Sequence, residues 1–72
     1  MDAIDFTHSN LRERVREDMA NAITALDFLA TSIGQLAALH ETDEEDAIIT
    51  EGQVLAAKRE MVKAVTGLLE AE

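Results

Sequence analysis

The chain has 72 residues and a net charge of −9, with fifteen Asp and Glu against six Lys and Arg. It has no cysteine, which excludes disulfides and thiolate metal sites, and this charge disfavours nucleic acid and anionic membranes as partners. The length and the absence of proline predict one all-α domain over residues 1–72. The short apolar runs and the acidic start predict a soluble, cytoplasmic protein, and the net charge predicts that its charged partners are basic.

Residues 1–9 are expected to form an N-terminal tail, followed by a helix from about 10 to 40. Asn10 is expected to cap this helix, because Glu13 lies three residues later, at the spacing of a capping box. Apolar residues follow at alternating spacings of four and three: Val15, Met19, Ala22, Leu26, Leu29, Ile33 and Leu36. A second row, Ile23, Ala30 and Ala37, widens the apolar arc to roughly half of the circumference.

The segment Glu41–Asp46 carries five carboxylates and precedes a second helix, expected over about 42–71. In one reading Thr42 caps this helix with Glu45, and the acids then lie in the first turn, where the helix dipole favours them. In the other reading the helix begins near Thr50 and Gly52 marks a break. The first reading is preferred, because it leaves a short turn between antiparallel helices.

The second helix repeats the pattern of the first. One row holds Ala47, Thr50, Val54, Ala57, Met61, Ala64 and Leu68, and Leu55, Val62, Val65 and Leu69 widen it. Each helix therefore carries more apolar surface than one neighbour can cover, which predicts a two-helix antiparallel hairpin that dimerises into a four-helix bundle. The expected dimer core is Leu26, Leu29, Ile33, Leu36, Val54, Met61, Val65 and Leu68.

In outline this arrangement resembles the Rop-type bundle, in which two helical hairpins pack antiparallel as a dimer. The resemblance is one of architecture alone. Rop-type proteins bind RNA through a basic helical face, and the sequence has no such face, so RNA binding is not implied.

The sequence is poorly supplied for catalysis or cofactor binding. Ser9 and His8 are adjacent in sequence, but adjacency does not give them hydrogen-bonding geometry. The acidic segment lacks the glycine and ligand spacing of a calcium loop, and no Glu has a His three residues later, as di-iron bundles require. We therefore expect no enzyme, no catalytic or metal-binding residues and no cofactor.

The remaining hypothesis is a small acidic protein–protein interaction module that regulates or inhibits another protein. The expected partner-binding residues combine apolar anchors with acids, namely Phe28, Leu39, Asp43, Glu44 and Ile49. Two alternatives stay open: an acidic nucleic-acid mimic that blocks a DNA- or RNA-binding protein, and a helical-hairpin chaperone.

Overall fold

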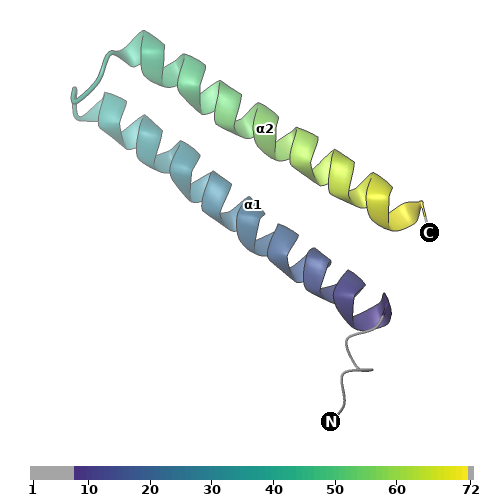
Figure 1. Cartoon of the computed structure of the whole chain (residues 1–72). Coiled ribbons are helices and arrows are strands. Elements are labelled where there is room, and N and C mark those ends of the chain that lie inside the picture. Colours follow the sequence, from purple (N-terminus) through teal and green to yellow (C-terminus); the bar gives the residue numbers. More distant parts are fainter. Residues whose placement is uncertain (1–7, 72) are drawn as a thin grey trace.

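The chain folds into two long helices, α1 (His8–Ala38) and α2 (Glu44–Glu70), which lie side by side and run antiparallel (Figure 1). A computed structural model describes residues 8–71, with side chains from 10 to 71. Within this range every residue belongs to a helix or to the connecting and terminal turns, so the all-helical hairpin is confirmed. The smallest extent of the Cα trace is 10 Å, the thickness of a single layer of helices.

The helix boundaries differ from the expected ones by a few residues. Helix α1 begins at His8, so Asn10 lies inside the first turn and its expected role as the cap is wrong. The part of the expected tail before His8 lies outside the described residues. Helix α2 continues through Gly52, so a start near Thr50 is also wrong, and the earlier of the two starts is confirmed to within two residues.

The contact between the helices is built from small and medium-sized apolar residues. Of the side chains that the structure describes, only those of Ala30 and Ala47 are buried, at 5% and 4% exposure. The residues around them are half-buried: Met19, Ile23, Leu26, Ile33 and Ala37 on α1, and Val54, Leu55, Met61, Val62, Val65 and Leu69 on α2. One helix pair thus shields its apolar residues only in part.

On each helix the contact takes in the second apolar row together with part of the first row, which on α2 contributes Ala47, Val54 and Met61. On α1 the second row, Ile23, Ala30 and Ala37, lies at the contact, whereas Leu29 and Leu36 are exposed. On α2 the second row is likewise half-buried at the contact, whereas four residues of the first row are exposed: Thr50, Ala57, Ala64 and Leu68. The buried alanines, Ala30 on α1 and Ala47 on α2, let the helices approach closely where they meet.

Two polar contacts between the helices fix their relative position. Lys58 Nζ lies 2.7 Å from Asp27 Oδ1, with the Lys58 side chain only 26% exposed. Arg12 donates a hydrogen bond to the carbonyl oxygen of Leu69, at the end of α2 where the helix dipole favours a cation. Such partly exposed contacts contribute about 0.2–1 kcal/mol each, so they define the register more than they stabilise the fold.

The other ion pairs among residues 10–71 lie within α1. Arg14 pairs with Asp18 at 3.8 Å, and Arg16 pairs with Glu13 at 3.5 Å. Neither α1 nor α2, as described, is long and apolar enough to cross a membrane.

Candidate functional site

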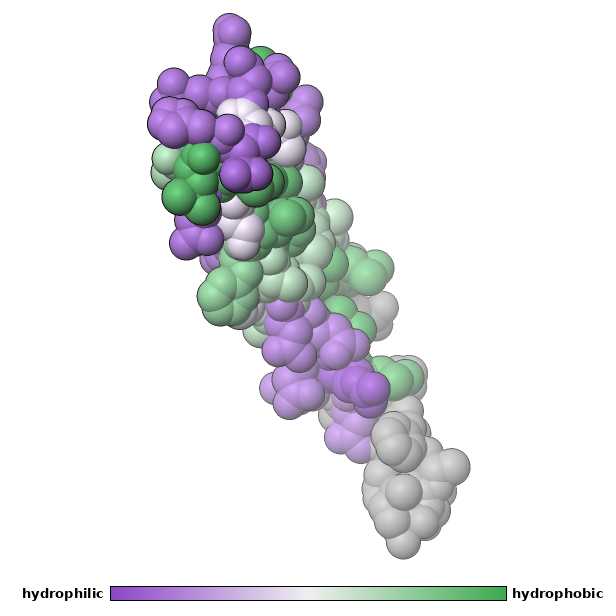
Figure 2. Space-filling model, turned by 90° about the vertical axis from the view of Figure 1, so that its left-hand side faces the viewer, coloured by the Kyte–Doolittle hydropathy of each residue, from purple (hydrophilic) through white to green (hydrophobic). Residues whose placement is uncertain are grey.

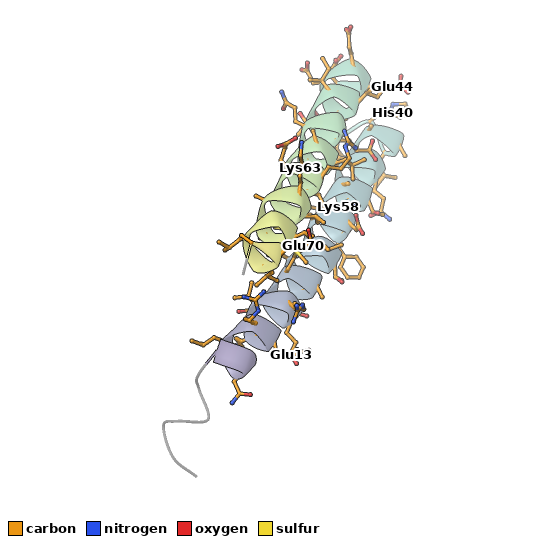
Figure 3. All side chains as sticks on the ribbon, turned by 90° about the vertical axis from the view of Figure 1, so that its right-hand side faces the viewer. Glu13, His40, Glu44, Lys58, Lys63 and Glu70 are labelled. Atoms are coloured by element: carbon orange, nitrogen blue, oxygen red, sulfur yellow. The ribbon has the colours of Figure 1, made fainter. Side chains whose placement is uncertain are left out.

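The turn between the helices is closed by a left-handed residue. His40 has φ 60°, and its N–H donates to the carbonyl of Ala37 at 3.0 Å. The next N–H, that of Glu41, donates to the carbonyl of Leu36 at 2.8 Å. This pair of bonds is the Schellman motif, which ends α1 sharply and satisfies two carbonyls at its end. Figure 3 shows His40 and Glu44 together at this end of the hairpin, with Glu13 at the other.

Asp43, and not Thr42, caps α2. Asp43 has an extended backbone, and its Oδ2 accepts a hydrogen bond from the N–H of Asp46 at 3.1 Å. The expected capping box of Thr42 and Glu45 is therefore wrong by one residue. The physical reason is that an Asp side chain is at least as good a cap as a Thr, and Asp43 comes one residue closer to the helix.

The acids of the turn are largely accounted for by the start of α2. Glu44, Glu45 and Asp46 occupy its first turn, where the exposed N–H groups favour negative charge. Among the described residues no three His, Asp or Glu side chains are grouped so as to hold a metal ion. The turn therefore supplies negative charge at the end of the hairpin without forming a cage.

Large apolar side chains stand exposed beside this acidic turn. Leu39 is 71% exposed, and Ile48 and Ile49 on the first turns of α2 are 61% and 54% exposed. Ile48 is a candidate that the sequence reasoning missed, although two consecutive isoleucines cannot both face one neighbouring helix. Together these residues form what we call the turn patch: Leu39, Asp43, Glu44, Ile48 and Ile49.

Phe28, the fifth residue of the expected partner site, is 69% exposed but lies outside the turn patch. It lies eleven positions before Leu39, the residue that follows the end of α1, which corresponds to about 16 Å along the helix axis. The structure therefore brings four of the expected partner-binding residues to one end of the hairpin and leaves Phe28 midway along α1.

A second exposed apolar surface follows one edge of α1. Leu29 and Leu36 are each 47% exposed, and Val15 is exposed in line with them. The opposite edge of α1 carries Asp27 and Gly34, whose neighbours on α2 are Lys58 and Glu51. We call the side that carries Leu29 and Leu36 the α1 edge and define it by its apolar residues, Val15, Ala22, Ala25, Leu29 and Leu36; the same side also carries Asp18, which pairs with Arg14, and Ser32.

Figure 2 shows the side of the molecule that lies on the left of Figure 1. Hydrophobic residues gather across the middle of this side, between the hydrophilic turn end and a hydrophilic stretch nearer the N-terminus. A soluble helical hairpin that needed no partner would be expected to cover this band with polar side chains.

The expected dimer core divides into two groups. Five of its members are half-buried between α1 and α2, namely Leu26, Ile33, Val54, Met61 and Val65. The other three, Leu29, Leu36 and Leu68, are exposed in the single hairpin. The first five residues thus pack within one chain, and the three exposed leucines are available to pack against another.

The described residues form no pocket between the helices that gathers chemical groups. The one hollow of note is shallow and is lined by α1 alone, by Asn10, Leu11, Glu13, Arg14 and Glu17. Residues on one exposed helical face do not enclose a substrate or exclude water from it, as a ligand site does. The surfaces of interest are therefore the turn patch and the α1 edge.

No protein-family model matches this sequence, and no match is found among curated proteins or solved structures.

Proposed function

We propose that this chain is a non-enzymatic, acidic protein–protein interaction module. In this proposal it forms a homodimeric four-helix bundle in the cytoplasm and binds, through the turn patch, a second protein with a basic surface, which it regulates or inhibits. The observation that carries the proposal is the imbalance of apolar residues within the described part of the chain: nine large ones are exposed there, while the only buried hydrophobic residues are two alanines.

The accessible surface supports a partner of some kind. The hairpin is a single elongated layer of two helices, which exposes more surface than a compact protein of equal mass does (Figure 1). An interface of standard size takes roughly 800 Å² from each partner, and the exposed leucines of the α1 edge supply apolar surface for one. A homodimer would cover the α1 edge, and the turn patch would remain for another protein.

The chemistry of the turn patch defines the kind of partner. Apolar anchors such as Leu39 and Ile49 supply burial, and the adjacent acids attract a positively charged protein and raise its rate of association. A fitting partner surface therefore has an apolar hollow or stripe bordered by Lys or Arg.

The proposal is tested by capture with matched baits. Wild-type protein and the variant Leu39→Ser/Ile49→Ser are immobilised, with Gln53→Ala, an exposed change on α2, as the control. We expect a protein with a basic surface that the wild type and Gln53→Ala retain and the double variant loses at least tenfold. Equal retention by all three baits would exclude the turn patch as the binding site, and repeated failure to retain any protein would refute the function.

The alternative of nucleic-acid mimicry draws support from the carboxylates gathered at the turn. A mimic binds through its charges, so affinity for a DNA- or RNA-binding protein should fall steeply as salt rises. Binding through apolar anchors should weaken far less. A titration of the captured complex with salt therefore separates the mimic from the module. A chaperone would instead prevent its client from aggregating, which light scattering measures.

A further inference from the structure

Charge is segregated along the length of the hairpin. The turn half, residues 28–57, contains no Lys or Arg, and its acids are Glu41, Asp43, Glu44, Glu45, Asp46 and Glu51. The terminal half, residues 8–26 and 59–71, balances five basic residues, Arg12, Arg14, Arg16, Arg59 and Lys63, with five acids, Glu13, Glu17, Asp18, Glu60 and Glu70. The pair of Asp27 and Lys58 marks the boundary. Among residues 8–71, one half therefore carries a charge of −6 and the other is neutral, and the rest of the net charge of −9 comes from Asp2, Asp5 and Glu72, outside the described residues.

The α1 edge crosses this boundary. Val15 lies in the terminal half and Leu29 and Leu36 lie in the turn half, so the edge extends for about 32 Å along the helix. Its middle is at Ala25, beside Ala22, where the side chains are smallest. Larger side chains occupy both ends of the edge.

We propose that a second copy of this chain covers the α1 edge in the antiparallel sense, about a two-fold axis close to Ala25. This inference rests on the dimer in the proposed function and adds to it the face and the direction of packing. Leu36 of each copy then lies over Val15 of the other, and the two Ala25 residues meet at the axis, where their small side chains allow the helices to approach.

Charge complementarity selects this direction. In a parallel dimer the two turn halves would lie together, with a charge of −6 facing −6 across a distance comparable to the Debye length of about 8 Å. In the antiparallel dimer each acidic turn half lies over a terminal half whose described residues hold five cations and five acids. Apolar side chains would be covered in either direction, and electrostatic repulsion between the turn halves favours the antiparallel one.

The antiparallel dimer has a consequence for the partner. It places the two turn patches at opposite ends of the bundle, so neither is covered by the other copy. Each dimer should then bind two partner molecules independently, whereas a parallel dimer would present one joint acidic end.

Cross-linking through single cysteines tests the arrangement, because the natural chain has no cysteine. The variants are Ala25→Cys, Leu36→Cys and Val15→Cys, oxidised mildly alone and in mixtures. Thr24→Cys is the matched control, since it lies one residue away along α1 but on the side of Asp27. Circular dichroism and light scattering establish that each variant keeps its helicity and its mass in solution.

We expect Ala25→Cys to form a disulfide with itself, while Leu36→Cys alone and Thr24→Cys alone do not. A disulfide needs Cα atoms about 4.4–6.8 Å apart, whereas the two copies of residue 36 would be about 33 Å apart along the axis. A mixture of Val15→Cys and Leu36→Cys should cross-link to each other.

Self-linking of Leu36→Cys, or linking of Thr24→Cys as efficient as that of Ala25→Cys, would overturn the inference and leave the dimer intact. A monomeric wild type at micromolar concentration would overturn both the inference and the dimer. If Leu36→Cys loses helicity, Leu36→Glu is used in its place. This variant should raise the dissociation constant of the dimer at least tenfold. If Leu36→Glu left the dimer unchanged, the α1 edge would be excluded as the interface. Failure to capture a partner bears on the proposed function alone.

Discussion

Replacing Gly52 by alanine should stabilise the protein, because Gly52 lies inside the continuous helix α2. A Cβ atom at this position would meet no atom within 4 Å, and the residue is exposed. The gain then comes from helix propensity alone, which favours alanine over glycine in a helix interior by about 1 kcal/mol. For a domain of this size a change of about 1 kcal/mol raises the midpoint of thermal unfolding by about 4–8 °C.

The measurement is thermal unfolding followed by far-ultraviolet circular dichroism, at one fixed protein concentration because a dimer's midpoint depends on concentration. Gly67→Ala is the matched control, since Gly67 also lies in α2 with no atom within 4 Å of the added Cβ. We expect Gly52→Ala to gain at least as much as Gly67→Ala, because Gly67 is nearer the end of the helix. A gain at Gly67 with none at Gly52 would refute the continuity of α2 through the segment beside Ile48 and Ile49.

Three further predictions concern the turn and the contact between the helices. Asp43→Ala should lower the free energy of unfolding by about 1 kcal/mol, while Asp43→Asn, which keeps a capping oxygen, and Thr42→Ala should change it by less than about 0.5 kcal/mol; an equal loss for Thr42→Ala would contradict the assigned cap. His40→Gly should stabilise by about 0.5–1 kcal/mol in chemical denaturation, because glycine adopts a positive φ at no steric cost, and a loss would show that the imidazole makes a contact of its own. A double-mutant cycle of Asp27→Ala and Lys58→Ala should give a coupling of about 0.2–1 kcal/mol that shrinks at high salt; zero coupling at low salt would remove this pair as a determinant of register.

The helices themselves were predictable because their signals are local. Alternating spacings of four and three identify both helices, and the concentration of acids in Glu41–Asp46 locates the start of the second one. The identity of the caps was less accessible, because Thr42 and Asp43 both qualify as caps and only the backbone path distinguishes them. Likewise, the amino-acid sequence around Leu39 does not indicate that His40 adopts a positive φ.

The rotation of the helices could not be read from periodicity. An apolar arc of half the circumference specifies a face but not which of its rows meets the neighbouring helix. In the hairpin the close row on α1 is that of Ala30, where two backbones can approach, and the row of Leu29 and Leu36 is left at the edge. The sequence therefore predicted the surplus of apolar surface correctly, and only the three-dimensional arrangement shows where the surplus lies.

The position of the exposed apolar surface bears on the role of the acidic turn. Capping and the helix dipole explain why Asp43, Glu44, Glu45 and Asp46 stand where they do. They do not explain why no Lys or Arg occurs anywhere between Phe28 and Ala57, since cations on the outer faces of the helices would neither disturb the cap nor cost stability. The absence of cations is accounted for if this half of the hairpin must repel a parallel copy and attract a basic partner, and both demands act on the same residues.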